Sequence, residues 1–207
     1  IPASLGGGTC TINTNTKSTW NFTTVTVPAS YTLTASGSLG LTVKATGNVT
    51  VGGSMHTSAA SNSSTAGAVG YNGGGWMSNG SGPGGGLAAN NGGSGGSMYA
   101  IFGSGGSGGG ADYYNDGETD SSSPGGGGGG VLKITSGGNV TVNSGGSIGS
   151  QGASFTASAA CAGSGGFLSV IASGIITNSG TIAANGGAGT WDWPSGGGGG
   201  GGYGGSG

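Results

Sequence analysis

Charged residues are almost missing from this sequence. Only 4% of the 207 residues are Asp, Glu, Lys or Arg, whereas about 25% is usual for a soluble protein. The only cations are Lys17, Lys44 and Lys133, and there is no arginine. Nucleic-acid binding depends on neutralising many phosphates, so this composition excludes nucleic acid as a partner. The net charge of −2 also argues against disorder, which normally accompanies high net charge.

Long apolar runs and catalytic side chains are also scarce. No stretch approaches the ~20 apolar residues of a membrane helix, so we expect no helical membrane span. His56 is the only histidine, and without arginine the chain cannot readily assemble a base, an orienting group and an oxyanion donor, so we expect no enzyme. The chain begins at Ile1 rather than Met, which suggests that a signal peptide has been removed from a secreted protein.

A short pattern of alternating apolar and polar residues occurs three times, at residues 41–55, 132–148 and 168–182. Each copy has three very short strands separated by corners that contain glycine. Such a repeat is typical of a chain that winds round a β-solenoid. We therefore predict an all-β fold, a short right-handed β-solenoid (β-helix). In the first copy the period of two points these residues inward: Leu41, Val43, Val49, Val51 and Met55.

The domain organisation follows from where this alternation begins. It starts at Trp20 and continues round the corner at residues 28–30, so residues 20–207 should form a single solenoid domain with a first coil before the first copy. Residues 1–19 hold few apolar residues and are predicted to be an N-terminal arm. A further strand is expected at residues 97–102.

Glycine contributes 59 residues, mostly in three inserts at about residues 58–96, 103–130 and 186–207. There is no Gly-X-Y period, so collagen is excluded. The inserts follow a third strand or a Gly corner, so they should leave the solenoid on one side. They would either be flexible linkers or form extended polyglycine II helices that hydrogen-bond sideways into a sheaf.

Two cysteines, Cys10 and Cys161, fit one disulfide in an oxidising compartment. That bond would clip the N-terminal segment to the last coil. The alternative is two buried thiols.

Four of the five acidic residues lie within residues 112–120, namely Asp112, Asp116, Glu118 and Asp120. Oxygen ligands at this density would hold Ca²⁺, which takes six to eight oxygens. The spacing is not that of an EF-hand. A solvated acidic loop tip is the alternative, and no other cofactor is expected.

Trp76, Trp191 and Trp193 lie in the Gly-rich inserts. Their flat apolar faces would stack on the rings of surface glycans. Alternatively they cover Gly-rich backbone or make a subunit contact.

The run at residues 22–28, the strand at 32–34 and the copy at 41–51 resemble the opening of secreted, glycine-rich β-solenoid proteins of prokaryotes. The Gly run before Leu132 is similar too. A polyglycine sheaf also resembles the tips of certain phage tail fibres and some insect antifreeze proteins. These resemblances imply a location outside the cell and a structural or adhesive role.

Three functions are consistent with these features. The first is the subunit of a secreted extracellular filament or sheath, because a solenoid without charged caps leaves strand edges open at both ends for self-association. The second is an adhesin or carbohydrate-binding tip that uses the tryptophans. The third is ice binding by outward threonines, such as Thr24, Thr26, Thr32 and Thr34.

Overall fold

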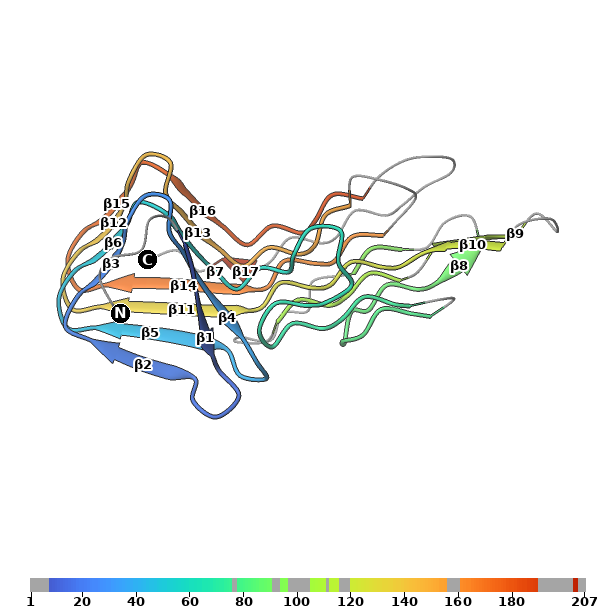
Figure 1. The fold of residues 1–207 in the computed structure, drawn as a ribbon, viewed down its shortest axis with the longest axis horizontal. Coiled ribbons are helices and arrows are strands. Elements are labelled where there is room, and N and C mark those ends of the chain that lie inside the picture. Colours follow the sequence, from blue (N-terminus) through green and yellow to red (C-terminus); the bar gives the residue numbers. More distant parts are fainter. Residues whose placement is uncertain are drawn as a thin grey trace.

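The computed structural model describes residues 8–75, 78–90, 94–96, 105–110, 112–115, 120–155, 161–189 and 203–204. These residues form β-strands and irregular segments without a helix. In this part of the chain there is accordingly no apolar helix long enough to cross a membrane. Figure 1 shows a body of stacked strands from which extended segments project to one side.

The body is a β-solenoid of three parallel sheets, which the chain visits in a fixed order. Sheet I contains β2 (Thr19–Phe22), β5 (Leu41–Ala45), β11 (Val131–Ser136), β14 (Phe167–Ala172) and β17 (Tyr203–Gly204). Sheet II contains β3 (Val25–Val27), β6 (Val49–Val51), β12 (Val140–Val142) and β15 (Ile176–Asn178). Sheet III contains β1 (Thr9–Asn13), β4 (Thr32–Ser36), β7 (Ser54–His56), β13 (Ser147–Gly149) and β16 (Thr181–Ala183).

The predicted copies are stacked in register, which confirms the all-β solenoid. Leu41, Leu132 and Leu168 are aligned on neighbouring strands of sheet I. The same alignment joins the copies in sheet II and sheet III. The first coil, β2 to β4, adds a further layer, with Trp20 beside Val43.

Alternation along the strands places the core inside the coils. The five residues predicted to point inward from the first copy are all fully buried, and so are their counterparts Leu132, Ile134, Val140, Val142 and Ile148. The intervening Thr42 and Lys44 are not buried. Each fully buried aliphatic side chain contributes ~1.5–3 kcal/mol before chain entropy is subtracted.

All excursions leave at the corner between sheet III and sheet I. This corner is short after β1 and β4, where residues 14–18 and 37–40 suffice. After β7 and β13 it expands into residues 57–130 and 150–166, and after β16 it continues outward through residues 184–189. In the described residues the inserts therefore leave the solenoid on one side, as predicted (Figure 1). The excursion at 150–166 was not predicted, and the inserts at 58–96 and 103–130 belong to one excursion.

The excursions pack into a sheaf around residues 125–130. The amides of residues 125 to 130 donate, in that order, to the carbonyls of Gly74, Cys161, Ser63, Tyr71, Ser164 and Thr57, at 2.6–3.0 Å. Amides three residues apart reach the same neighbouring segment, and amides one residue apart reach different segments. This is the period of a three-residue helix of the polyproline II type. Segments 105–110 and 150–155 also donate to the carbonyls of residues 126, 127 and 129.

The sheaf needs glycine for close approach rather than for unusual backbone angles. Residues 125–130 are all buried. Among the described glycines of the sheaf, only Gly82 has a positive φ, of 95°. A Cβ at Gly127 or Gly128 would instead overlap the backbone of an adjoining segment. The backbone polar groups are thus satisfied between segments, as buried amides and carbonyls must be.

Part of the expected N-terminal arm belongs to the solenoid. Residues 9–13 form β1, which pairs in parallel with β4, and Thr19–Phe22 form β2. The apolar residues there are few, but Ile12 packs against the core cluster. Residues 1–7, and the strand expected at 97–102, lie outside the described residues.

Candidate self-association surfaces

The predicted disulfide is not present. Cys10 is exposed on β1, while Cys161 is buried in the sheaf, and the two are not bonded to each other. The carbonyl of Cys161 accepts a hydrogen bond from Gly126. The prediction was wrong because it placed Cys161 at a coil. The residue instead lies in the excursion between β13 and β14, which the repeat pattern did not reveal.

Two of the four predicted calcium ligands lie on a small hairpin beyond the sheaf. It is formed by β9 (Asp112–Asn115) and β10 (Asp120–Ser123), with β8 (Ala89–Asn90) beside β9. Asp112 pairs with Ser123 and Asp120 pairs with Asn115, so the two acidic positions stand at opposite ends of the hairpin. Asp116 and Glu118 lie outside the described residues. Within the described part there is no cluster of three metal-ligating side chains.

The three predicted contact tryptophans, Trp76, Trp191 and Trp193, also lie outside the described residues. A fourth tryptophan, Trp20, was noted only as the start of the first coil. It lies at an end of the solenoid, where it contributes to one of the two surfaces described next.

Within the described part of the chain, the N-terminal end of the solenoid is an open surface. It is bounded by β1, β2 and β3, the edge strands of sheets III, I and II. Apolar side chains from the core are only half-buried here: Ile12, Trp20, Phe22, Tyr31 and Ala35. The indole Nε1 of Trp20 is buried without a hydrogen-bond partner among the described residues.

Among the described residues, the C-terminal end is open in the same way. β15 and β16 are the edge strands of sheets II and III, and the two-residue β17 is the edge of sheet I. The half-buried apolar side chains at this end are Ala172, Ile176, Ile182 and Ala184. The inner coils are fully covered, so the incompletely covered core is concentrated at the two ends.

The described edge strands at both ends contain none of the charged residues that commonly block an edge strand. Residues 161–189 contain no Asp, Glu, Lys or Arg, and neither do residues 18–43. Lys17 stands just before β2, with its Nζ 4.6 Å from the centre of the Trp20 ring. This single cation covers one aromatic face and leaves the three edge strands open.

The outer faces carry ranks of hydroxyl groups. Thr26, Thr50, Thr141 and Thr177 are aligned on sheet II. A second rank on sheet III contains Thr9, Thr32, Ser54, Ser147 and Thr181. In-register parallel strands repeat about every 4.8 Å. The threonines named in the sequence analysis lie on different faces, because Thr26 belongs to sheet II while Thr32 and Thr34 belong to sheet III.

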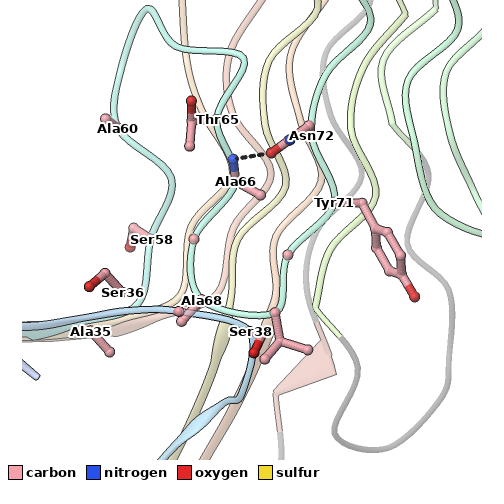
Figure 2. Close-up of a pocket in the computed structure, with 14 residues that line it drawn as sticks. Ala35, Ser36, Ser38, Ser58, Ala60, Thr65, Ala66, Ala68, Tyr71 and Asn72 are labelled. Carbon is pink, nitrogen blue, oxygen red and sulfur yellow. Dashed lines mark hydrogen bonds between the residues drawn. The ribbon is translucent and has the colours of Figure 1, made fainter. Parts of the chain in front are cut away.

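An open cavity of about 640 Å³ lies between the short corner after β4 and the first excursion. Figure 2 shows Ser36 and Ser38 on the solenoid side of it, with Ser58, Thr65 and Asn72 on the excursion. The Asn72 side chain accepts a hydrogen bond from the Ala66 amide at 2.9 Å. No charged or titratable side chain other than Tyr71 lines the cavity, so it offers neither an acid–base pair nor a set of metal ligands.

The imidazole of His56, at the end of β7, is half-buried. Burial lowers the pKa of its imidazole below the ordinary value of 6.5. Nδ1 is buried and has no hydrogen-bond partner among the described residues. No carboxylate faces it from β4 or β13, the strands that pair with β7. The described strands beside His56 therefore supply it with no orienting acid.

Comparison of the chain with protein-family models, with curated proteins and with solved structures found no match.

Proposed function

We propose that this protein is the structural subunit of a secreted extracellular filament or sheath, formed by head-to-tail association of identical solenoids. The observation that carries the proposal is the pair of open, uncharged solenoid ends. Both ends expose unpaired strand edges and half-buried core residues. Edges of this kind pair with another chain unless they are blocked.

The contact joins two different surfaces, an N-terminal end and a C-terminal end. Such a heterologous contact generates an open helical filament unless its rotation happens to close a ring. Self-association also removes the half-buried side chains from water, at about 25 cal/mol for each Å² of apolar surface. The coils are few, so this extra burial is a substantial addition to a small core.

The proposal includes no catalytic role. The hydroxyl-rich, neutral surface and the single histidine favour a structural role. An extracellular location is supported by the same composition and by the resemblance to secreted solenoid proteins. The partner is a second copy of this chain, with surface glycans as the alternative if the subunits remain separate.

A charge introduced at one end tests the proposal. Ile182→Lys places an ammonium group on the half-buried face of edge strand β16, and we expect it to abolish or shorten filaments. Ile175→Lys adds the same charge to the same coil at a corner residue that is 70% exposed, and should leave filaments intact. Equal filament lengths for both variants and the wild type would argue against association through the solenoid ends.

The threonine rank on sheet II favours ice binding as a second candidate. Its four threonines are aligned on neighbouring strands, at about 4.8 Å intervals. Each strand of sheet II supplies only one outward residue, so the rank is a single row of threonines. Thermal hysteresis measured in dilute solution tests this candidate, and Thr50→Val together with Thr141→Val should remove any activity.

A further inference from the structure

The three sheets do not begin and end in the same coil, and the step at one end of the solenoid is complementary to the step at the other. Coils can be numbered as layers, with β2, β3 and β4 in layer 1 and β14, β15 and β16 in layer 4. Sheet III then starts one layer early, because β1 lies in layer 0 beside β4. Sheet I ends one layer late, because β17 lies in layer 5 beside β14. Figure 1 shows this stacking in sheet I, from β2 at the bottom through β5 and β11 to β14.

These steps fit each other at one offset only. Sheet III fills layers 0–4 and sheet I fills layers 1–5, so each has five strands. A second copy placed five layers further along continues both sheets without overlap and without a missing strand. Resting on the proposed function, we propose that subunits join at this five-layer offset, with a composite coil made of β17 from one subunit and β1 from the next.

The register of the joint follows from the alignments within the subunit. In sheet III, Thr9 aligns with Thr32, Ser54, Ser147 and Thr181, and Cys10 aligns with Leu33, Met55, Ile148 and Ile182. Extending these columns places Ile182 beside Cys10 of the next subunit. In sheet I, the same extension places Gly204 beside Ser18 of the next subunit.

This register covers the groups that the free subunit leaves half-exposed. Leu33, Met55 and Ile148 are buried, at 3%, 0% and 0% exposure, so the column to which Cys10 and Ile182 belong points into the core. β1 is the edge strand of sheet III among the described residues, and Cys10 on it is exposed. At the joint it becomes an internal position. The half-buried Ile12 enters the same interface.

Sheet II is one strand short at the joint. Its four strands fill layers 1–4, so layer 5 stays open between β15 of one subunit and β3 of the next.

The offset fixes the axial repeat of the filament. Five layers at about 4.8 Å give a rise of about 24 Å per subunit. A joint that skipped or shared a layer would give about 29 or 19 Å instead. The rise therefore separates this joint from other end-to-end contacts.

Cysteine cross-linking tests the register. Neighbouring strands hold aligned Cα atoms about 4.8 Å apart, within the range of a disulfide. We expect Ile182→Cys, with the natural Cys10, to give a ladder of reducible oligomers after mild oxidation with copper phenanthroline. Ile175→Cys on the same coil and the double variant Ile182→Cys with Cys10→Ser should give no ladder.

Fibre diffraction of wild-type filaments measures the axial rise per subunit without any variant, and a rise of about 24 Å is expected. Filaments with another rise and no Ile182→Cys ladder would overturn the five-layer joint while leaving the filament proposal intact. A wild-type protein that stays monomeric at high concentration would overturn both.

Discussion

A methyl group placed at Gly128 is the sharpest test of the packed sheaf. The Gly128 amide donates to the Tyr71 carbonyl at 2.9 Å, and its carbonyl accepts from the Gly67 amide at 3.0 Å. A Cβ at this position would overlap the carbonyl of Gly106 and lie 3.0 Å from the amide nitrogen of Ser107. These are backbone atoms, so no side-chain rotation relieves the overlap.

The expected cost of Gly128→Ala has two parts. Overpacking of a close-packed interior costs ~1–3 kcal/mol. When the segment shifts to make room, the hydrogen bonds to Tyr71 and Gly67 lengthen, at ~1 kcal/mol each. We therefore expect the free energy of unfolding to fall by ~3–5 kcal/mol, a large part of the ~5–15 kcal/mol of a typical domain.

Gly75→Ala is the matched control within the same sheaf. A Cβ at Gly75 would meet no atom of the described residues within 4 Å, and Gly75 is not among the described glycines with positive φ. The added methyl group also restricts the unfolded chain, so the change should lie between about −0.5 and +1 kcal/mol. Urea unfolding followed by aromatic fluorescence measures both variants, and amide hydrogen exchange locates the loss. Equal unfolding midpoints for the two variants would refute close packing around residues 125–130.

Three further predictions concern single side chains. Because the folded pKa of His56 is lowered, its contribution to stability is complete above pH 6.5 and is lost as the pH falls through the folded pKa. The variant His56→Thr copies Thr34 on the paired strand, and its free energy of unfolding should depend less on pH below 6.5 than that of the wild type. An unchanged pH profile would argue against burial of the imidazole. Cys10 should react with iodoacetamide in the unassembled protein while Cys161 reacts only after denaturation, as mass spectrometry would show; rapid alkylation of Cys161 would contradict its burial in the sheaf. A calcium site at residues 112–120 predicts that a chelator lowers the melting temperature and that Asp116→Ala abolishes this effect; a wild-type protein that is indifferent to chelator would return the loop to solvated surface.

The solenoid could be predicted because its information lies in side chains of alternating polarity. The Val-Thr-Val triplets at residues 49–51 and 140–142 repeat both the strand and its inward face, so periodicity gave the register of β6 and β12 correctly. The rule fails at Val131 and Phe167. Both stand at outward positions of sheet I but are 4% and 9% exposed. The Lys133 ammonium lies over the Phe167 ring, and Val131 packs beside Gly40.

The sequence predicted that the Gly-rich segments could pack side by side, but it did not predict which segments would be neighbours in the sheaf. Glycine has no side chain, so the six glycines at residues 125–130 give no sign of which segment each amide will reach. The excursion at 150–166 was missed for the same reason, since its Ser, Ala and Gly residues resemble an ordinary corner. The error over Cys161 follows directly from that omission.

The scarcity of charged residues in the sequence predicted open strand edges at the solenoid ends, but it did not predict the shape of these ends. Missing charges predicted open edges, but the early start at β1 and the late end at β17 depend on pairings between distant segments. Residues 9–13 carry one strongly apolar side chain, Ile12, so their pairing with β4 is set by the neighbouring coil rather than by their own pattern.

Electron microscopy of the protein from its native source tests the central claim most directly. The account predicts unbranched filaments in which the solenoid axis runs along the fibre, with a strand repeat of about 4.8 Å in the axial direction. Sheaves should project from the side of each filament, in the direction that Figure 1 shows for one subunit. Isolated subunits without filaments, in native material and in concentrated purified protein alike, would contradict the account.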